Sequence, residues 1–538
     1  MAETILKKRK NKPINPAGRL WVTARKVTQY TLLAVFCLLF LMSKRDGGWS
    51  GNVVNIPMRL DPLTILAHLI SSRTLLAGSA LALITLGLTL VFGRAWCGWI
   101  CPLGTALDLF PLDKVRGKRP PPAEGWRKVK YLLLLATLTA ALLGNLTLLV
   151  FDPLTIVFRT LTTAIWPVVD RVIMALEKLL FRVPFLSGPV ASFDTFVRPN
   201  LLPASPAFFR DALLFGMLFL AIISLNAFAE RFWCRYLCPL GGLLGWISKI
   251  ALFRRSVGEE CPGCVLCTDH CPTGTIDPAK NYASDPAECT MCLDCLETCP
   301  RSKIAFTAGL PKPEWQTYDP GRREFLMVVG ASAAAIALSK VGMLARREPP
   351  HLIRPPGMRE ANPDILAVTK CIRCSECMRV CPTQAIQPSV LEAGAEGFGV
   401  PIIIPRLGYC DYSCNACGQV CPTQAIPPLS LDEKRQRVIG QAYIDQNRCI
   451  AWADRTNCFV CEEMCPLPEK AIVLTDEAGN VLTGEGGLET SEGAGTSAIR
   501  LPRVNRELCI GCGICEYKCP VNGESAIRVY IPTTTAAL

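Results

Sequence analysis

The stretch CPGCVLCTDHCP occupies residues 261–272 and holds four cysteines: Cys261, Cys264, Cys267 and Cys271. Three thiolates on one short loop can bind three corners of an iron–sulfur cubane, while the fourth, directly before proline, reaches a neighbouring cluster. The spacing therefore predicts a small α+β domain built around [4Fe–4S] clusters.

The same spacing recurs three times and is stretched twice more. The other regular motifs hold Cys289, Cys292, Cys295 and Cys299; Cys371, Cys374, Cys377 and Cys381; and Cys509, Cys512, Cys515 and Cys519. The stretched motifs hold Cys410, Cys414, Cys417 and Cys421, and Cys449, Cys458, Cys461 and Cys465. We expect six [4Fe–4S] clusters, bound by 24 of the 29 cysteines.

A zinc site or a disulfide framework is the alternative use of such cysteines. Zinc sites usually join two CxxC units across a long gap. Four thiolates packed closely and closed by proline, in motif after motif, are instead typical of bacterial ferredoxins.

The first half of the chain is apolar, whereas the second half is polar and rich in cysteine and proline. Residues 30–42, 75–92, 131–151 and 212–228 are expected to cross a bilayer, with a fifth apolar helix at 325–344. Segment 156–185 is apolar but carries charges, so we expect an interfacial helix there.

The predicted fold is an α-helical membrane bundle of four to five spans with two α+β ferredoxin-like modules. The bundle takes residues 1–255, a two-cluster module 256–318, the fifth helix 319–346 and a four-cluster domain 347–538.

Basic residues predict an orientation for this bundle. They stand at the amino terminus (Lys7, Lys8, Arg9, Lys10, Lys12) and after the second predicted span (Lys114, Arg116, Lys118, Arg119, Arg127, Lys128, Lys130). The positive-inside rule places both segments, and the two-cluster module, in the cytoplasm. Because this asymmetry accounts for much of the net charge of +12, no nucleic-acid partner is needed.

Arg322 and Arg323 directly precede Phe325, Leu326 and an alanine-rich apolar segment, which resembles a twin-arginine export signal. That interpretation places the last four motifs outside the cytoplasm. An ordinary anchor or a peripheral linker is the alternative, and Lys340, Arg346 and Arg347 argue against export by charge. We favour export, because such a signal is an address read by a receptor.

Two further cysteine pairs stand in near-identical surroundings, GRAWCGWICPLG at 93–104 and RFWCRYLCPLG at 231–241. The likeness predicts an internal repeat that brings Cys97, Cys101, Cys234 and Cys238 together. They could bind a further iron–sulfur cluster, cycle between dithiol and disulfide beside a quinone, or simply pack as helix-ending turns. Trp96, Trp99 and Trp233 could wall a quinone pocket or serve as interfacial anchors, and Cys37 is expected to be a buried apolar residue.

The sequence lacks the residues that usually bind other redox cofactors. The histidines are His68, His270 and His351, and no CxxCH motif occurs, so haem is not expected. No Rossmann fingerprint is present. The sequence predicts electron transfer and, at most, quinol dehydrogenation, without a site for a terminal substrate.

Residues 1–300 resemble the membrane polyferredoxin that serves periplasmic nitrate reductase and, more distantly, the nitrous-oxide reductase regulatory protein. Residues 320–538 resemble the exported four-cluster ferredoxin of the same system, so the chain looks like a fusion of the two. The resemblance implies a multi-pass cell-membrane protein of anaerobic respiration that oxidises quinol and reduces an extracytoplasmic terminal reductase. A redox factor for assembling another metalloenzyme is the alternative function.

Cluster pairing is also implied by the resemblance. In the two-cluster module, Cys299 would join Cys261, Cys264 and Cys267, and Cys271 would join Cys289, Cys292 and Cys295. In the four-cluster domain the outer motifs would pair, so that Cys519 joins Cys371, Cys374 and Cys377.

Overall fold

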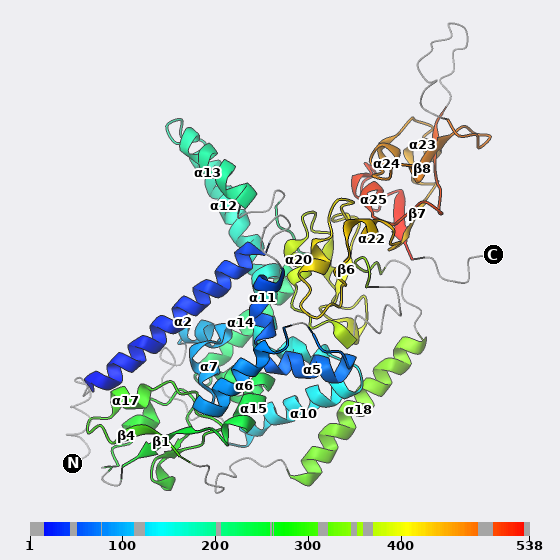
Figure 1. Ribbon diagram of the computed structural model, residues 1–538. Coiled ribbons are helices and arrows are strands. Elements are labelled where there is room, and N and C mark those ends of the chain that lie inside the picture. Colours follow the sequence, from blue (N-terminus) through cyan, green and yellow to red (C-terminus); the bar gives the residue numbers. More distant parts are fainter. Residues whose placement is uncertain are drawn as a thin grey trace, which may run out of the picture. The chain divides into compact units, whose positions relative to one another are not determined.

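The computed structural model describes residues 15–43, 51–76, 78–111, 124–200, 206–258, 261, 263–309, 321–345, 352–358, 369–482 and 499–531. They fall into two units (Figure 1). Unit 1 comprises Met1–Met42, Val53–Leu161 and Leu213–Leu338, and unit 2 comprises Ser43–Asn52, Thr162–Ala212 and Ser339–Leu538. The basic residues 7–12 and 114–119, His351, Arg346, Arg347 and the side chain of Lys340 lie outside the described residues.

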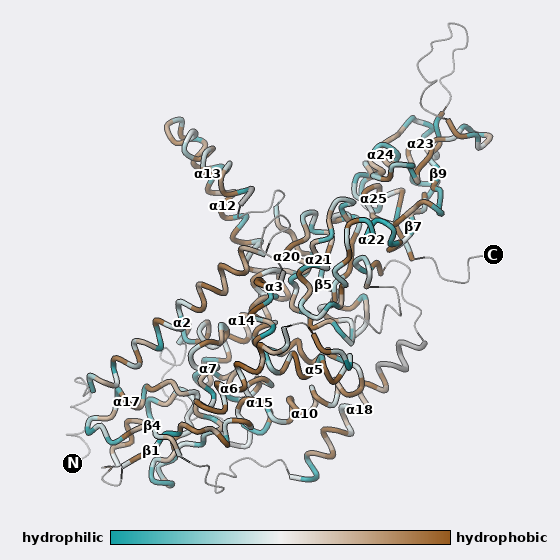
Figure 2. Tube along the Cα trace, viewed as in Figure 1, coloured by the Kyte–Doolittle hydropathy of each residue, from teal (hydrophilic) through white to brown (hydrophobic). Residues whose placement is uncertain are grey.

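Unit 1 is a helical bundle followed by a small two-cluster module. Its helices are α2 (Pro16–Met42), α4 (Ile56–Arg59), α5 (Pro62–Ser72), α6 (Leu81–Phe92), α7 (Ala95–Trp99), α8 (Pro102–Leu109), α10 (Lys128–Leu142), α11 (Pro153–Thr160), α14 (Ala212–Ser224) and α15 (Pro239–Ser248). Short α3 (Gly51–Val54) crosses the unit boundary. The long helices are predominantly hydrophobic along their length (Figure 2).

The predicted bundle of four to five full-length spans is not confirmed. By length and composition, one described helix, α2, is long and apolar enough to cross a bilayer; α5, α6 and the segment Ala212–Ala227 are apolar but shorter. Glycines in the left-handed region explain two of the short helices. Gly78 (φ +84°) precedes α6, and Gly144 (φ +76°) follows α10, so neither helix extends over the whole predicted stretch.

A second repeated motif precedes the cysteine pairs. DPLTIL at 61–66 and DPLTIV at 152–157 start α5 and α11, and in each the aspartate caps the helix while proline takes its first position. The carboxyl groups of Asp61 and Asp152 are fully buried and hydrogen-bonded to each other. Two carboxyl oxygens can share a hydrogen bond only if a proton lies between them.

The two-cluster module closes unit 1. Antiparallel strands β1 (Phe253–Val257) and β4 (Ile304–Ala308) enclose α16 (Leu266–Asp269), the β2–β3 pair (Ile276–Asp277, Ala283–Ser284) and α17 (Asp294–Thr298). Its small core contains Cys267, Cys295 and Cys299 beside Ile276 and Ile304. With so few apolar residues, a module of this size needs a further source of stability, which metal–thiolate bonds at its cysteines would supply.

The start of α2 lies against this module (Figure 1). Arg25 forms an ion pair with Asp294 of α17 at 3.2 Å, and Asn15 N–H donates to the carbonyl of Glu297. The helix therefore begins well before the predicted span. After the module comes α18 (Arg322–Ala345), whose Glu324 pairs with Lys128 at 3.4 Å.

Unit 2 contains the four-cluster domain and a helical hairpin from the first half of the chain. The predicted interfacial segment is divided between α11, a π-helical turn (Leu161–Ile165) and α12 (Trp166–Leu180), and α13 (Ser187–Asn200) follows. The domain holds α20 (Glu376–Val380), α21 (Ala416–Gln419), α22 (Leu431–Arg435), α23 (Ile450–Ala453), α24 (Val460–Glu463) and α25 (Ile514–Lys518). Its strands pair as β5–β6 (Ile386–Pro388, Pro401–Ile403), β7–β10 (Gln441–Ile444, Ile527–Tyr530) and β8–β9 (Ile472–Thr475, Leu501–Val504).

The segment just before α14 packs onto the four-cluster domain. Phe209 shares a hydrophobic core with Cys371 and Cys377. Phe208 N–H donates to the side chain of Gln384, and Arg210 N–H donates to that of Gln387 at 3.1 Å. Residues far apart in the chain are thus joined in one unit.

Replacing Gln387 with alanine should loosen this packing. The Gln387 side chain accepts from Arg210 N–H and donates to the carbonyls of Phe208 and Gln384. Each lost hydrogen bond is worth about 1 kcal/mol, so local opening should be at least roughly fivefold faster. Hydrogen–deuterium exchange should show faster exchange at Phe208 and Arg210. Gln424→Ala is the control, because Gln424 is an exposed glutamine of the same domain. Equal exchange in both variants would contradict the assignment.

Candidate iron–sulfur sites

The four regular cysteine motifs share an unusual backbone. The residues on either side of the second cysteine both have positive φ angles: Gly263 and Val265, Met291 and Leu293, Arg373 and Ser375, Gly511 and Gly513. Five of these eight are not glycine, so the loops hold conformations that cost free energy. Backbone turns of this kind direct successive N–H groups into a concavity that suits anions and iron–sulfur clusters.

In four places, three cysteines of one motif and the last cysteine of another line a common pocket. The sets are Cys261, Cys264, Cys267 and Cys299; Cys371, Cys374, Cys377 and Cys421; Cys449, Cys458, Cys461 and Cys519; and Cys465, Cys509, Cys512 and Cys515. Two more sets of cysteines lie close enough to interact electrostatically. Cys271 lies near Cys289, Cys292 and Cys295, and Cys381 lies near Cys410 and Cys417, with Cys414 beside them.

These sets match the expected pairing of the two-cluster module but not that of the four-cluster domain. The expectation that Cys519 joins Cys371 is wrong, because Cys519 lies with Cys449, Cys458 and Cys461. Motifs adjacent in the sequence exchange their last cysteines, the first with the second and the third with the fourth. The domain is thus two ferredoxin-like halves in succession.

The cysteine sets suit a cubane better than a single metal ion. Within the described ranges, no three His, Cys, Asp or Glu side chains lie close enough to hold one metal ion. A cubane holds its four thiolates apart by the width of the cluster. Burial raises the pKa of Cys289 to about 11 and that of Cys512 to about 12, so iron must displace protons when it binds.

The structure brings Cys97, Cys101, Cys234 and Cys238 together. All four are buried, and they lie close enough to interact electrostatically. Both pairs have one geometry: Cys101 and Cys238 each precede a proline that starts a helix, α8 or α15. Backbone N–H of Gly241 donates to Cys238 Sγ at 3.2 Å.

Helix α7, which carries Cys97, directly contacts the module. Trp99 Nε1 donates to the carbonyl of Met291 at 2.8 Å. A Cβ atom on Gly98 would lie 2.1 Å from the carbonyl oxygen of Thr290, so only glycine allows this approach. Thr290 and Met291 stand between Cys289 and Cys292, so the helix of Cys97 neighbours that cysteine set. We call Cys97, Cys101, Cys234 and Cys238 the membrane cysteines, after their place in the predicted bundle.

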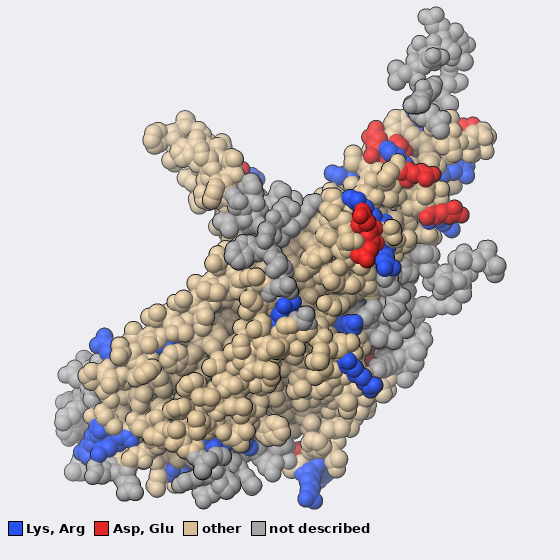
Figure 3. All heavy atoms as spheres, in the orientation of Figure 1, with Lys and Arg blue, Asp and Glu red and all other residues tan. Residues whose placement is uncertain are grey.

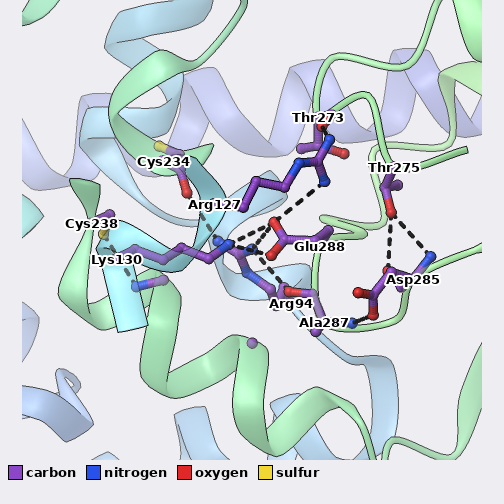
Figure 4. Close-up of polar contacts among 12 residues, drawn as sticks. Arg94, Arg127, Lys130, Cys234, Cys238, Thr273, Thr275, Asp285, Ala287 and Glu288 are labelled. Atoms are coloured by element: carbon purple, nitrogen blue, oxygen red, sulfur yellow. Dashed lines mark hydrogen bonds and ion pairs between the residues drawn. The ribbon is translucent and has the colours of Figure 1, made fainter. Parts of the chain in front are cut away.

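Charged residues at this contact are buried rather than solvated. Lys130 Nζ lies 2.6 Å from both carboxylate oxygens of Glu288, which also meets Arg94 and Arg127 (Figure 4). Burial opposes ionisation of Glu288, but Lys130, Arg94 and Arg127 together hold its pKa below the usual value. Sequence reasoning missed this group, since Lys130 and Glu288 are 158 residues apart and the basic residues were interpreted only as topology signals.

Comparison with known proteins gives three family models. A 4Fe-4S binding domain matches residues 74–122 and 212–258, which include all four membrane cysteines; a 4Fe-4S dicluster domain matches 370–425; and a 4Fe-4S binding domain matches 502–523. No solved structure matches.

The ferredoxin-type protein NapG of Escherichia coli (strain K12) is 31% identical over 215 residues, which are 39% of this chain and 85% of NapG. The chain belongs to the family of ferredoxin-type proteins. The methylamine utilization ferredoxin-type protein MauM of Methylorubrum extorquens is 30% identical over 39% of this chain and 89% of MauM. The family models and the names of these relatives agree on iron–sulfur binding.

Another similar protein is the putative electron transport protein YccM of Escherichia coli (strain K12), 29% identical over 42% of this chain. The aligned region is 54% of YccM, so the chain spans about half the length of this relative. For protein NirI of Paracoccus denitrificans, 30% identical over 42% of this chain, the share is 29%.

The revised pairing can be tested with Cys519→Ser. The variant should lose the same cluster signal as Cys458→Ser, because both residues line one pocket. Cys421→Ser is the matched control and should instead reproduce Cys374→Ser. Electron paramagnetic resonance spectra of the dithionite-reduced proteins distinguish these outcomes. A Cys519→Ser spectrum that matches Cys374→Ser would restore the pairing of the outer motifs.

Proposed function

We propose that this chain is a membrane-bound conduit that takes electrons from quinol beside Cys97, Cys101, Cys234 and Cys238 and passes them to an extracytoplasmic terminal reductase. The six cysteine sets would each hold a [4Fe–4S] cluster, and the membrane cysteines one more. Bound clusters supply one-electron transfer; the protein supplies their placement, their charge environment and the exclusion of water.

The observation that carries this proposal is the contact of Gly98 and Trp99 with Thr290 and Met291. It joins α7, which carries Cys97, to the loop between Cys289 and Cys292. A route from quinol to the module needs such closeness.

Two tryptophans favour a quinone beside the membrane cysteines. Trp96 and Trp233 stand next to Cys97 and Cys234, and both are buried. Within the described part of the chain, neither indole N–H has an acceptor. A buried donor without an acceptor costs about 1–3 kcal/mol. A quinone carbonyl or quinol hydroxyl oxygen is an acceptor of the right kind.

The course of the chain supports an arrangement in which the two-cluster module and unit 2 lie on opposite sides of the membrane. The start of α2 meets α17, the start of α10 follows Arg127, which donates to Thr273, and the start of α18 meets Lys128. On the face of unit 1 shown in Figure 3, Lys and Arg gather near α17 and the start of α18. These ends share the module's side, which the positive-inside rule makes cytoplasmic.

The carboxyl ends of α2 and α18 and the amino end of α14 are continuous with unit 2. Unit 2 takes Ser43–Asn52 after α2, Thr162–Ala212 up to the first residue of α14, and Ser339–Leu538, which begins within α18. We place unit 2 outside the cytoplasm on this connectivity and on Arg322 and Arg323 at the start of α18.

Replacing Cys238 with serine should abolish reduction of the clusters by quinol while dithionite still reduces them. The reason is that only the quinol-facing site loses a thiolate. Cys37→Ser is the matched control, since Cys37 lies alone in α2. Stopped-flow absorbance under anaerobic conditions measures both rates. Unchanged quinol oxidation in Cys238→Ser would place the quinol site elsewhere.

A further inference from the structure

Glu288 gathers buried cations from three separate parts of unit 1. Lys130 comes from α10, Arg127 from the turn before it, and Arg94 from the turn before α7. The exposed fractions of Lys130, Glu288 and Arg94 are 0%, 1% and 1%. Tyr131 adds a hydrogen bond to Glu288 at 3.2 Å.

The charges in this group do not cancel. Arg235 is a fourth buried cation nearby and interacts with Arg127, Glu288 and Cys271. Asp285 is the second buried carboxylate; it accepts from Ala287 N–H at 2.8 Å. Around Glu288, three buried cations therefore face one carboxylate. Buried charge is costly unless it is compensated, so further negative charge near these cations is favourable.

The cysteine sites lie where that charge is needed. Arg94 interacts electrostatically with Cys97 and Cys238, and its Nη2 donates to the carbonyl of Cys234 at 3.4 Å (Figure 4). Arg235 faces Cys271, and Glu288 directly precedes Cys289. Arg94 thus interacts with cysteines of both sites, Arg235 interacts with Cys271, and Lys130 and Arg127 meet the residue that precedes Cys289.

We propose that Arg94, Arg127, Lys130 and Arg235, gathered around Glu288, form a charge-compensating shell that raises the reduction potential of the cluster on Cys271, Cys289, Cys292 and Cys295. A [4Fe–4S] centre with four thiolates carries two negative charges when oxidised and three when reduced. Nearby cations stabilise the reduced form more, and net charge is one determinant of cluster potential. The shell makes this cluster the acceptor for electrons from the membrane cysteines.

The neighbouring cluster site has a different environment. Of its ligands, Cys264 is exposed and Cys261 is partly exposed, so solvent screens charge there. The two clusters of the module should therefore respond differently when a shell cation is removed. The inference rests on the proposed function, since it requires clusters at both sites.

The test is the midpoint potential of each module cluster in the full-length chain, measured by redox titration with electron paramagnetic resonance. Lys130→Met should lower the potential of the Cys289 cluster by roughly 59 mV, which is a tenfold change for a one-electron couple. Lys130→Arg should retain the parental potential. Lys280→Met is the matched control, because Lys280 is an exposed lysine of the same module.

Iron analysis distinguishes a failure of the proposed function from a failure of the charge-compensating shell. Parental protein without iron at the Cys289 site would overturn the proposed function itself. Iron retained in Lys130→Met with an unshifted potential would overturn the shell alone. If Lys130→Met loses iron, Arg235→Met tests the same charge from another element, since Arg235 lies in the π-helical turn Trp233–Leu237 and interacts with Cys271 and Glu288. An unshifted potential in that variant would also refute the shell.

Discussion

The ion pair of Glu288 with Lys130 is the constraint on which the arrangement of unit 1 depends. A fully buried carboxylate must be neutralised, and three basic residues from the bundle meet it. Removing one partner from such a group costs about 3–5 kcal/mol, because the other charges remain buried. The module cannot shift along the bundle without exposing or stranding these charges, so its cysteines stay fixed beside the membrane cysteines.

Close backbone approach completes this arrangement. Gly98 lies against Thr290, and a Cβ atom on Gly245 would lie 2.8 Å from the carbonyl of Ala287. Ser248 donates to the neighbouring Pro286 carbonyl at 2.9 Å. Both repeats of the bundle thus contact residues on either side of Cys289. The helices next to the Cys-Pro turns, α7 and α15, therefore also dock the module.

Short-range patterns in the sequence predicted the local parts of the molecule. Cysteine spacing determines which three thiols share a loop, and the likeness of WCGWICPLG to WCRYLCPLG predicted that two distant pairs would meet. The partner of each fourth cysteine in the four-cluster domain was not predictable in this way. It depends on which motifs fold together. Cys421 and Cys519 each directly precede a proline, yet they line different pockets.

Long-range electrostatics was equally hidden. In the sequence, Lys130 and Arg127 look like basic residues that mark a cytoplasmic loop. Only the fold shows that they are buried around Glu288. The lengths of the apolar helices also differ from expectation, because glycines such as Gly144 end them early. The DPLT repeat was visible in the sequence and could have been recognised as a second sign of internal duplication.

The central claim is that one chain carries electrons from the module's side of the membrane to the other. Fusions of a cysteine-free reporter, one after Ser302 and one at the carboxyl terminus, show most directly on which side of the membrane each site lies. The account predicts a cytoplasmic report after Ser302 and an extracytoplasmic report at the carboxyl terminus. Two reports from the same side would contradict it.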